Sequence, residues 1–211
     1  MTEVHGRRGL YAVTPDEADT ARLLALVRPV LAGGAALLQY RNKRAAPDLR
    51  CAQAQAVLGL CREYGVPLLI NDDLALALAI GADGVHLGRD DGDVAAARRA
   101  LGVGRLLGVS CYDEWARAER GARAGADYVA FGAMFASPTK PLAPRAPLEL
   151  VTRARRELGV AVATIGGITL DNAPALVAAG ADLLAVITDV FAAPDPAART
   201  RAYHALFTAA D

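Results

Sequence analysis

The chain has 211 residues, of which 54% are hydrophobic and 22% are charged, and its 23 basic side chains balance 23 acidic ones. A formal net charge of zero argues against a nucleic-acid-binding protein and against a basic membrane-binding surface. Residues 1–8 are polar, no apolar run is long enough to span a bilayer, and the three cysteines are not closely paired. We therefore expect a cytoplasmic protein with one sizeable core, and the sequence leaves a homo-oligomer open.

Short apolar runs alternate with helical patterns along the whole chain. The first run, residues 9–13, is followed by Thr14, Pro15 and Glu17, the residue types of a helix N-cap, a first helical position and a capping box. We predict that the first helix starts here, with Thr14 as its N-cap, and stops at Gly33. Further helices are predicted over residues 47–64, 74–80, 93–101, 112–124, 148–158, 171–179 and 196–209.

The second apolar run, residues 36–38, leads into Gln39, Arg41 and Lys43. If the extended conformation continues, these alternate residues lie on one face of the strand. Arginine supplies a planar fork of donors and lysine a compact charge, and together they suit a diphosphate. A solvated basic loop is the alternative interpretation.

Residues 68–91 read as strand, helix and strand, with acidic side chains after each strand. Asp73 precedes the helical pattern and is interpreted as a helix N-cap. Asp72 and Asp91 follow neighbouring parallel strands, so we expect them at the same end of the sheet, where two carboxylates suit Mg²⁺. His86 lies inside an apolar strand and is interpreted as a buried histidine with satisfied hydrogen bonds.

Ser110 stands near the end of a predicted strand over residues 106–111. No His and Asp partners for a nucleophilic serine are evident, so a hydrogen-bonding role is predicted. The following proline-rich stretch, residues 133–147, predicts an irregular loop. Its Ser137, Thr139 and Lys140 suit a phosphate-binding lid, with an ordinary polar crossover as the alternative.

The last two predicted strands indicate a second anion site. Gly166 and Gly167 follow the strand at residues 160–165, and a Gly-Gly turn lets backbone N–H groups approach a phosphate closely. Ile187 and Thr188 close the last strand, residues 183–188. Barrels commonly bind phosphate in the loops after strands seven and eight.

The tripeptide Gly-Ala-Asp recurs at positions 81, 125 and 180, each time between a helical pattern and an apolar run. About eight such strand–helix units predict a single-domain (β/α)₈ barrel over residues 1–211. A doubly wound open sheet is the runner-up, but a Gly-x-Gly-x-x-Gly turn after the first strand is absent.

Two phosphate sites at one barrel mouth, with two acids for Mg²⁺, suggest a reaction that joins two phosphorylated small molecules. Pyrophosphate would be the leaving group, and Mg²⁺, Arg41, Lys43 and Lys140 would neutralise the charge that builds on it.

Five ordered motifs carry a resemblance to a known family. They are Gln39-Tyr40-Arg41-Asn42-Lys43, Asn71-Asp72-Asp73, His86-Leu87-Gly88-Arg89-Asp90-Asp91, Ser137-Pro138-Thr139-Lys140 and Ile165-Gly166-Gly167-Ile168. Together they resemble thiamine phosphate synthase, from Leu10 to Phe191. The resemblance implies a (β/α)₈ barrel that joins a hydroxymethylpyrimidine diphosphate to a thiazole phosphate, forming thiamine phosphate and releasing pyrophosphate by a dissociative substitution.

The resemblance also implies roles for individual residues. Asp72 and Asp91 would bind Mg²⁺. The pyrimidine diphosphate would be held by Gln39, Arg41, Lys43, Asn71, Ser110 and Lys140, with Arg41, Lys43, Ser110 and Lys140 as the catalytic set. The thiazole phosphate would be held by Ser137, Pro138, Thr139, Gly167, Ile187 and Thr188.

Some positions depart from the family pattern. Arg89 stands where the family usually has Gln, Ser137 replaces a Thr, and Ala133 and Ala136 occupy positions where Pro is common. A related thiazole tautomerase would need a His at the position of Ala133, and none stands there. The other alternative is a non-catalytic barrel that binds phosphorylated ligands, which would not need to keep the leaving-group residues.

Overall fold

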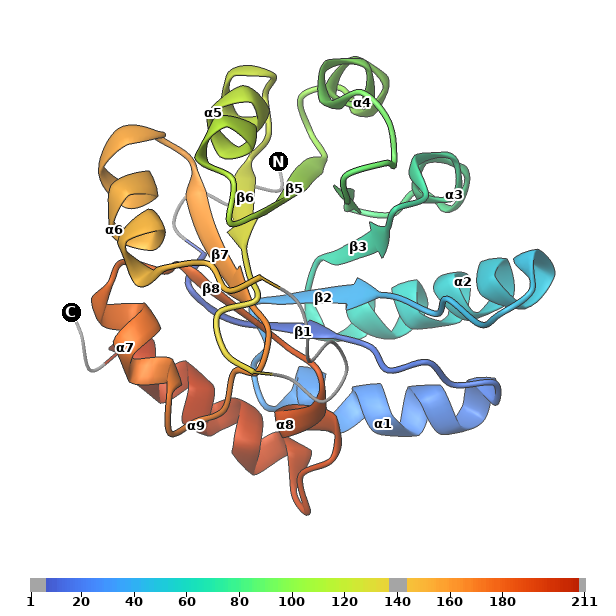
Figure 1. Ribbon diagram of the computed structural model, residues 1–211. Helices are drawn as coiled ribbons and strands as arrows, with labels where there is room; N and C mark the ends of the chain where they lie inside the picture. Colours follow the sequence, from blue (N-terminus) through green and yellow to red (C-terminus); the bar gives the residue numbers. More distant parts are fainter. Residues whose placement is uncertain (1–6, 137–143, 209–211) are drawn as a thin grey trace.

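The computed structural model describes residues 7–136 and 144–208, and it shows a closed barrel of eight parallel strands in chain order, β1 to β8. Helices surround the barrel (Figure 1). This confirms the predicted (β/α)₈ barrel, and the open sheet is wrong because β1 pairs with β8 as well as with β2.

The strands are short, and the helices and loops that connect them lie on the outside of the barrel. Their bounds are β1 Gly9–Val13, β2 Leu37–Tyr40, β3 Leu68–Asn71, β4 Gly84–Leu87, β5 Leu106–Tyr112, β6 Tyr128–Phe131, β7 Ala161–Ile165 and β8 Leu183–Val186. The helices are α1 Thr20–Ala32, α2 Pro47–Tyr64, α3 Leu74–Ile80, α4 Val94–Leu101, α5 Trp115–Arg123, α6 Leu148–Glu157, α7 Ala173–Ala178, α8 Thr188–Phe191 and α9 Pro196–Thr208.

The Gly-Ala-Asp repeat marks three junctions between a helix and the following strand, at the amino-terminal end of the barrel. Each glycine has a positive φ, +67° at Gly81, +94° at Gly125 and +100° at Gly180, which ends the preceding helix at little steric cost. Each aspartate carboxylate then accepts a hydrogen bond from a backbone N–H of the preceding strand. The three bonds are Asp83 with Leu68 at 2.8 Å, Asp127 with Leu107 at 2.6 Å and Asp182 with Val162 at 2.9 Å.

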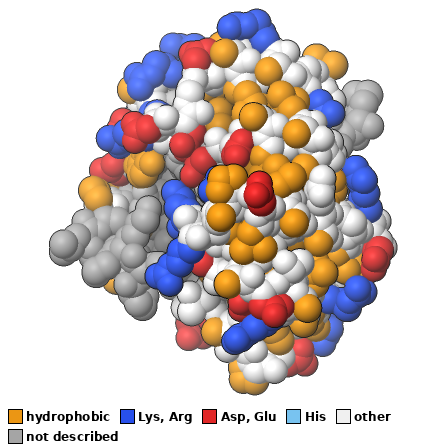
Figure 2. All heavy atoms as spheres, turned by 90° about the vertical axis from the view of Figure 1, so that its right-hand side faces the viewer, with side chains coloured by type: hydrophobic (Ala, Val, Ile, Leu, Met, Phe, Trp, Pro, Cys, Tyr) orange, Lys and Arg blue, Asp and Glu red, His pale blue; other side chains and the backbone are white. Residues whose placement is uncertain are grey.

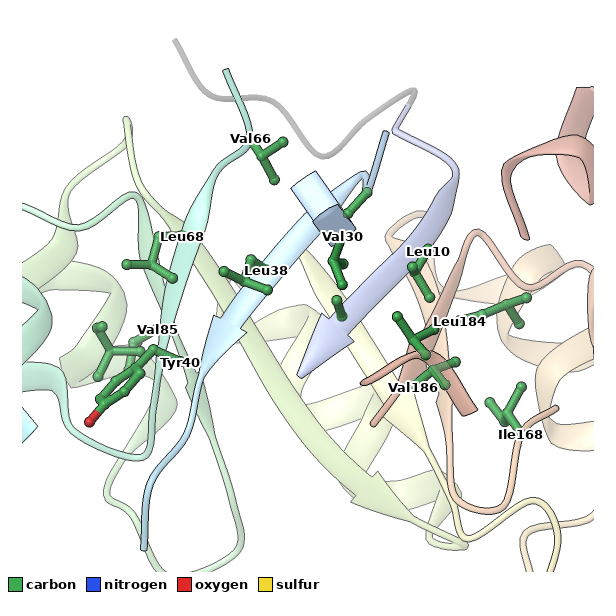
Figure 3. Close-up of a cluster of buried hydrophobic side chains, with 14 of the residues drawn as sticks. Leu10, Val30, Leu38, Tyr40, Val66, Leu68, Val85, Ile168, Leu184 and Val186 are labelled. Carbon is green, nitrogen blue, oxygen red and sulfur yellow. The ribbon is translucent and has the colours of Figure 1, made fainter. Parts of the chain in front are cut away.

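Two hydrophobic clusters stabilise the barrel. The larger one fills the layer between strands and helices, and Figure 3 shows part of it, including Leu10, Leu38, Leu68 and Leu184. The smaller one fills the barrel interior; its members include Tyr11, Leu69 and Tyr128. Burying one such side chain contributes about 1.5–3 kcal/mol to folding, so these layers fix the positions from which the site residues project.

The predicted start of the first helix is wrong. Helix α1 begins at Thr20, and its N-cap is Asp19, whose carboxylate accepts a 2.8 Å hydrogen bond from the backbone N–H of Arg22. Thr14 is fully buried, and its hydroxyl is bonded to both the N–H and the carbonyl of Arg41. The hydroxyl therefore joins the end of β1 to the end of β2. The local sequence pattern, which resembles a helix cap, does not reveal this contact.

Helix α3 contains only Leu, Ala and Ile, and several of its side chains remain partly exposed on the outer surface. Figure 2 shows hydrophobic side chains gathered on the side of the molecule that lies to the right in Figure 1. None of the described helices is long and apolar enough to cross a bilayer.

Candidate active site

A cavity of about 450 Å³ opens at the carboxyl ends of β2 and β3. Its lining combines cations, carboxylates and amides with a few apolar side chains: Tyr40, Arg41, Asn42, Lys43, Arg50, Ile70, Asn71, Asp72, Asp73, Leu74 and Asp91. The structure thus brings together five predicted site residues from three separate motifs: Arg41, Lys43, Asn71, Asp72 and Asp91. This is the end of the barrel at which ligands bind in parallel α/β folds.

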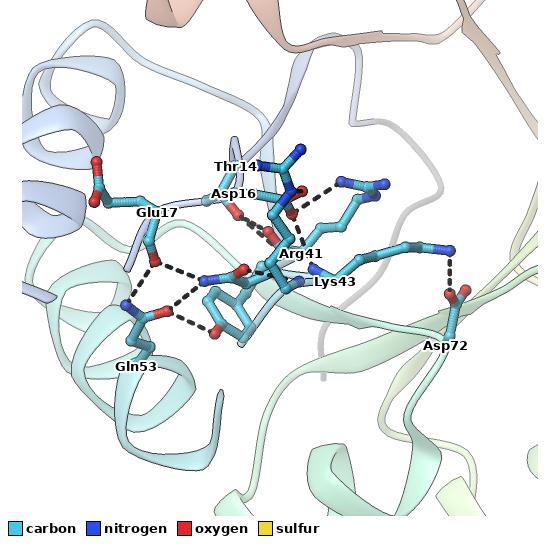
Figure 4. Close-up of polar contacts among 10 residues, drawn as sticks. Thr14, Asp16, Glu17, Arg41, Lys43, Gln53 and Asp72 are labelled. Atoms are coloured by element: carbon cyan, nitrogen blue, oxygen red, sulfur yellow. Dashed lines mark hydrogen bonds and ion pairs between the residues drawn. The ribbon is translucent and has the colours of Figure 1, made fainter. Parts of the chain in front are cut away.

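Arg41 and Lys43, two of the cations after β2, contact acidic side chains of neighbouring loops (Figure 4). A guanidinium nitrogen of Arg41 lies 3.2 Å from a carboxylate oxygen of Asp16, and Nζ of Lys43 lies 3.2 Å from a carboxylate oxygen of Asp72. The same Asp16 oxygen accepts a 2.9 Å hydrogen bond from the backbone N–H of Lys43. These contacts connect the loop after β2 to Asp16 and to the turn after β3.

The predicted alternation after β2 is wrong in part. The strand ends at Tyr40, so Arg41 and Lys43 project from a loop rather than from a continued strand. Gln39 is buried inside the barrel, with only 4% of its surface exposed. The strand ends early because Thr14 and Asp16 bind the backbone of residues 41 and 43.

Asp72 and Asp91 are in contact, as their positions after β3 and β4 predict. Partial burial acts to raise the pKa of Asp72, but contacts with Asp91 and Lys43 outweigh it, and the pKa is lowered. Burial and the neighbouring Asp72 raise the pKa of Asp91. Gly88 makes room for the pair, because a Cβ at that position would lie 2.5 Å from a carboxylate oxygen of Asp91.

The carboxylate pair fits a hard divalent cation. Mg²⁺ takes oxygen ligands and is commonly bound through one or two carboxylates, with water and substrate phosphates completing its shell. Within residues 7–136 and 144–208, no cluster of three or more His, Cys, Asp or Glu side chains suits a metal. Asp72 and Asp91 are thus a pair of carboxylates that could hold such a cation only with further ligands from water or substrate.

Asp73 has the capping role that the sequence predicts. Its carboxylate accepts a 2.8 Å hydrogen bond from the backbone N–H of Leu76, at the first turn of α3. Its neighbour Asp72 has a positive φ of +63°, a conformation that non-glycine residues adopt at some cost. The turn between β3 and α3 thereby uses one aspartate to cap the helix and directs the other toward Lys43 and Asp91.

A chain of hydrogen bonds crosses the barrel interior from Gln39 to Ser110. The amide nitrogen of Gln39 lies 2.5 Å from the Tyr11 hydroxyl, which lies 2.7 Å from the Tyr128 hydroxyl. The Tyr128 hydroxyl lies 2.8 Å from Nδ1 of His86, and Nε2 of His86 lies 2.8 Å from Oγ of Ser110. Burial lowers the pKa of His86 to about 4, so the imidazole is neutral at pH 7.

The second predicted anion site lies after β7 and β8. Ile165 pairs with Ala185, so Gly167 and Ile187, each two residues further along, follow neighbouring strands at the same level. Gly167 has a φ of +63°, and a Cβ there would lie 2.3 Å from the carbonyl oxygen of Ala136. Only glycine fits this turn without movement of the loop after β6.

The predicted end of the last strand is wrong by two residues. Strand β8 ends at Val186, and Thr188 begins the short helix α8, whose N-cap is Ile187. Ile187 packs against the barrel interior, whereas Thr188 is exposed. The predicted lid residues Ser137, Pro138, Thr139 and Lys140 lie outside the described residues.

Sequence reasoning missed several residues at this end of the barrel. Arg50 of α2 lines the cavity, and Arg117 of α5 donates to the carbonyls of Ser110 and Gly88, at 2.5 Å and 2.6 Å. Both project from helices whose polar faces look solvated in the sequence. The hydroxyls of Tyr11 and Tyr128 were also missed, because they occur within otherwise apolar strands.

Comparison with known proteins identifies the family. A family model described as thiamine monophosphate synthase matches residues 10–190. The chain is 64% identical over 202 residues to a thiamine-phosphate synthase of Aromatoleum aromaticum, covering 96% of this chain and 97% of that protein. It is 68% identical over 200 residues to a thiamine-phosphate synthase of Azoarcus sp., covering 95% and 97%.

A solved structure agrees with these relatives. The thiamine phosphate pyrophosphorylase from Pyrococcus furiosus superimposes with a TM-score of 0.82 at 30% identity, covering 95% of this chain and 96% of that one. The chain therefore belongs to the thiamine monophosphate synthase family, and it is a transferase of thiamine biosynthesis with a TIM-barrel fold.

Proposed function

We propose that this protein joins 4-amino-2-methyl-5-hydroxymethylpyrimidine diphosphate to a thiazole phosphate, giving thiamine phosphate and pyrophosphate. The observation that carries the proposal is the cavity in which Lys43 contacts Asp72, and Asp72 contacts Asp91, with Arg41 on the same wall. A site of mixed charge suits a diphosphate bound together with a cation, because each anionic oxygen finds a donor or a metal ion.

The reaction breaks the carbon–oxygen bond to the diphosphate, which leaves with the electron pair. The resulting pyrimidine-methyl cation is captured by the thiazole nitrogen, whose lone pair forms the new carbon–nitrogen bond. No protein nucleophile takes part. The protein's contribution is to hold the two reactants in line and to stabilise the negative charge on the departing diphosphate.

In this proposal Arg41, Lys43 and Asn71 hold the diphosphate. Lys140, which is not among the described residues, is proposed to assist them. Gln39 and Ser110 hold the pyrimidine. Asp72 and Asp91 hold Mg²⁺, which supplies charge neutralisation on the diphosphate oxygens when bound. Lys43, already in contact with Asp72, adds a second positive charge at the same end of the leaving group.

The thiazole phosphate is placed at the opposite side of the barrel mouth. Gly167 and Thr188 would offer backbone N–H groups to the phosphate, and Ile187 an apolar contact. Ser137, Pro138 and Thr139, outside the described residues, complete this set. Ala133 has no titratable group, so the acid–base chemistry of a tautomerase finds no support at that position.

The test combines the purified protein with both substrates and Mg²⁺, and follows thiamine phosphate and pyrophosphate together. We expect equal amounts of both products, and loss of both on addition of EDTA with recovery on excess Mg²⁺. Folded protein that forms neither product, while still binding one of the two substrates, would favour the non-catalytic binding barrel. Products formed at full rate in EDTA would contradict the metal assignment but not the reaction.

A further inference from the structure

We propose that Tyr11, Tyr128 and His86 are positioning residues that fix which atoms Gln39 and Ser110 present to the aminopyrimidine ring. This inference rests on the proposed function, and it deepens it by assigning the recognition of the ring to an ordered hydrogen-bond chain. The chain joins five strands, β2, β1, β6, β4 and β5, through the barrel interior.

The direction of the chain follows from its donors and acceptors. The amide nitrogen of Gln39 donates to Tyr11, so the single phenol proton of Tyr11 is free to point at Tyr128. Tyr128 accepts that proton and donates its own to Nδ1 of His86, because otherwise a buried hydroxyl proton would have no acceptor. A neutral imidazole with a bare Nδ1 carries its proton on Nε2, which donates to Ser110.

This order defines what Gln39 and Ser110 have left for a ligand. Gln39 keeps its carbonyl oxygen, which accepts a hydrogen bond, and the second N–H of its amide. Ser110 has its hydroxyl proton left, because its oxygen already accepts from His86. An aminopyrimidine carries the complementary pair, an exocyclic amine that donates and a ring nitrogen that accepts. The chain therefore selects an aminopyrimidine over a ring in which the amine is missing or replaced by a carbonyl.

The packing around the chain shows that its geometry is built into the barrel. The Tyr128 ring fills space that Gly108 leaves, since a Cβ at Gly108 would lie 2.0 Å from a ring carbon of Tyr128. Tyr128 packs edge-on against Tyr11, with ring centroids 5.7 Å apart, and stacks on His86 at 5.6 Å. Only 1% of Tyr11 and 8% of His86 are exposed, so water does not compete for these bonds.

The first experiment determines the direction of the hydrogen bonds from the tautomer of His86, without an activity measurement. Nitrogen-15 NMR of histidine-labelled protein at pH 7 distinguishes the two neutral tautomers, and loss of the signal in His86→Gln assigns it. We expect the Nε2-protonated form in the wild type and a mixture of tautomers in Tyr128→Phe, whose Nδ1 partner is gone. An Nδ1-protonated His86 in the wild type would overturn the proposed direction.

The second experiment measures ring selectivity. We expect the wild type to bind the pyrimidine diphosphate at least tenfold more tightly than the analogue that lacks the amine. In Tyr128→Phe this preference should fall below threefold, while affinity for the thiazole phosphate stays within twofold. Tyr11→Phe removes the other hydroxyl of the Tyr11–Tyr128 hydrogen bond and should lower the preference in the same way. It provides the test if Tyr128→Phe does not fold.

The matched control is Tyr203→Phe, which also removes a buried hydroxyl. This hydroxyl lies 2.7 Å from a carboxylate oxygen of Asp189 and is not part of the hydrogen-bond chain from Gln39 to Ser110. It should keep the wild-type preference for the amine. An equal loss of selectivity in Tyr203→Phe and Tyr128→Phe, or an unchanged selectivity in folded Tyr128→Phe and Tyr11→Phe, would reject a positioning role. If the NMR result holds but no pyrimidine diphosphate binds, the proposed function fails and the hydrogen-bond order stands.

Discussion

The two sides of the barrel mouth differ in how they are built. The side formed by β2 to β5, which we term the polar half, turns amide, imidazole and hydroxyl groups inward near its rim and ends in charged loops. The side formed by β6 to β8, which we term the small half, turns Ala130, Ala163 and Ala185 inward and ends in a Gly-Gly turn.

The difference indicates a division of work within one site. Side chains of the polar half contact other side chains, as Lys43 does Asp72 and Gln39 does Tyr11. Under the proposed function, the small half would hold the thiazole phosphate through the turn at Gly166 and Gly167. Substitutions in the polar half should therefore change charge and orientation, whereas substitutions in the small half should change shape.

The largest expected effect lies in the polar half. Asp72→Asn keeps the size of the side chain but removes the charge that pairs with Lys43 and would bind Mg²⁺. We expect turnover to fall by about 10²–10³-fold, a loss typical of removing one electrostatic stabiliser of a developing negative charge. Steady-state formation of pyrophosphate, measured over a range of Mg²⁺ concentrations, checks this.

Asp90→Asn is the matched control, because Asp90 is exposed in the loop that also carries Asp91. It should retain turnover within about twofold. Near-normal activity of Asp72→Asn at limiting Mg²⁺ would contradict the assignment of Asp72 as a Mg²⁺ ligand. It would also contradict the idea that the polar half stabilises the charge of the leaving group.

His86 gives the second effect, on stability rather than turnover. Its pKa is about 4 in the folded protein and 6.5 in an unfolded chain, so below pH 6.5 the unfolded chain binds the extra proton. The resulting stability is present above pH 6.5 and is lost as the pH falls toward 4, by about 3 kcal/mol in total. Urea unfolding at pH 7 and pH 4, in EDTA, measures it.

His86→Gln, which does not titrate at this position, is the comparison for that experiment. The free energy of unfolding of the wild type should fall more steeply between pH 7 and pH 4 than that of the variant. If the free energies of unfolding of the two proteins fell in parallel with pH, His86 would not be held neutral in the folded protein. Its place in the buried hydrogen-bond chain of the polar half would then be wrong.

The barrel and its closure were predictable from local sequence. The Gly-Ala-Asp repeat marks three of the places where a helix ends and a strand begins, and its aspartate bonds to the strand that precedes it. Asp72 and Asp91 were predictable as neighbours because parallel strands bring equivalent loops together.

The remaining features depend on contacts that are distant in sequence. Thr14 has the local signal of a helix cap, but its hydroxyl binds the backbone of Arg41, 27 residues away. Tyr11 and Tyr128 are 117 residues apart and read as ordinary core residues. Their pairing depends on the strand register and on the room at Gly108, which no single segment encodes.

The third effect tests the small half. Gly167→Ala places a Cβ 2.3 Å from the carbonyl oxygen of Ala136 in a residue with positive φ, so the turn must move. We expect the KM for the thiazole phosphate to rise about tenfold, since displaced N–H groups no longer meet the phosphate, while the KM for the pyrimidine diphosphate changes little. Initial rates with each substrate varied in turn separate the two.

Gly34→Ala controls for backbone strain, because Gly34 has a φ of +89° but nothing lies within 4 Å of an added Cβ. It should lower stability, as any alanine at positive φ does, without changing either KM. A rise in the KM for the pyrimidine diphosphate in Gly167→Ala would mean that the two halves are not independent.

The smallest effect is expected at Thr188, and its size decides whether the small half works through backbone or side chains. Thr188 is exposed at the first turn of α8, so its backbone N–H remains available when the side chain is changed. Thr188→Ala should raise the KM for the thiazole phosphate about threefold, the loss of one weak hydrogen bond, and Thr188→Ser should restore it. A rise of about thirtyfold or more, rescued by serine, would assign the phosphate to the hydroxyl, because a loss of that size is typical of a hydrogen bond to a charged group. The small half would then resemble the polar half in using side chains to hold charge.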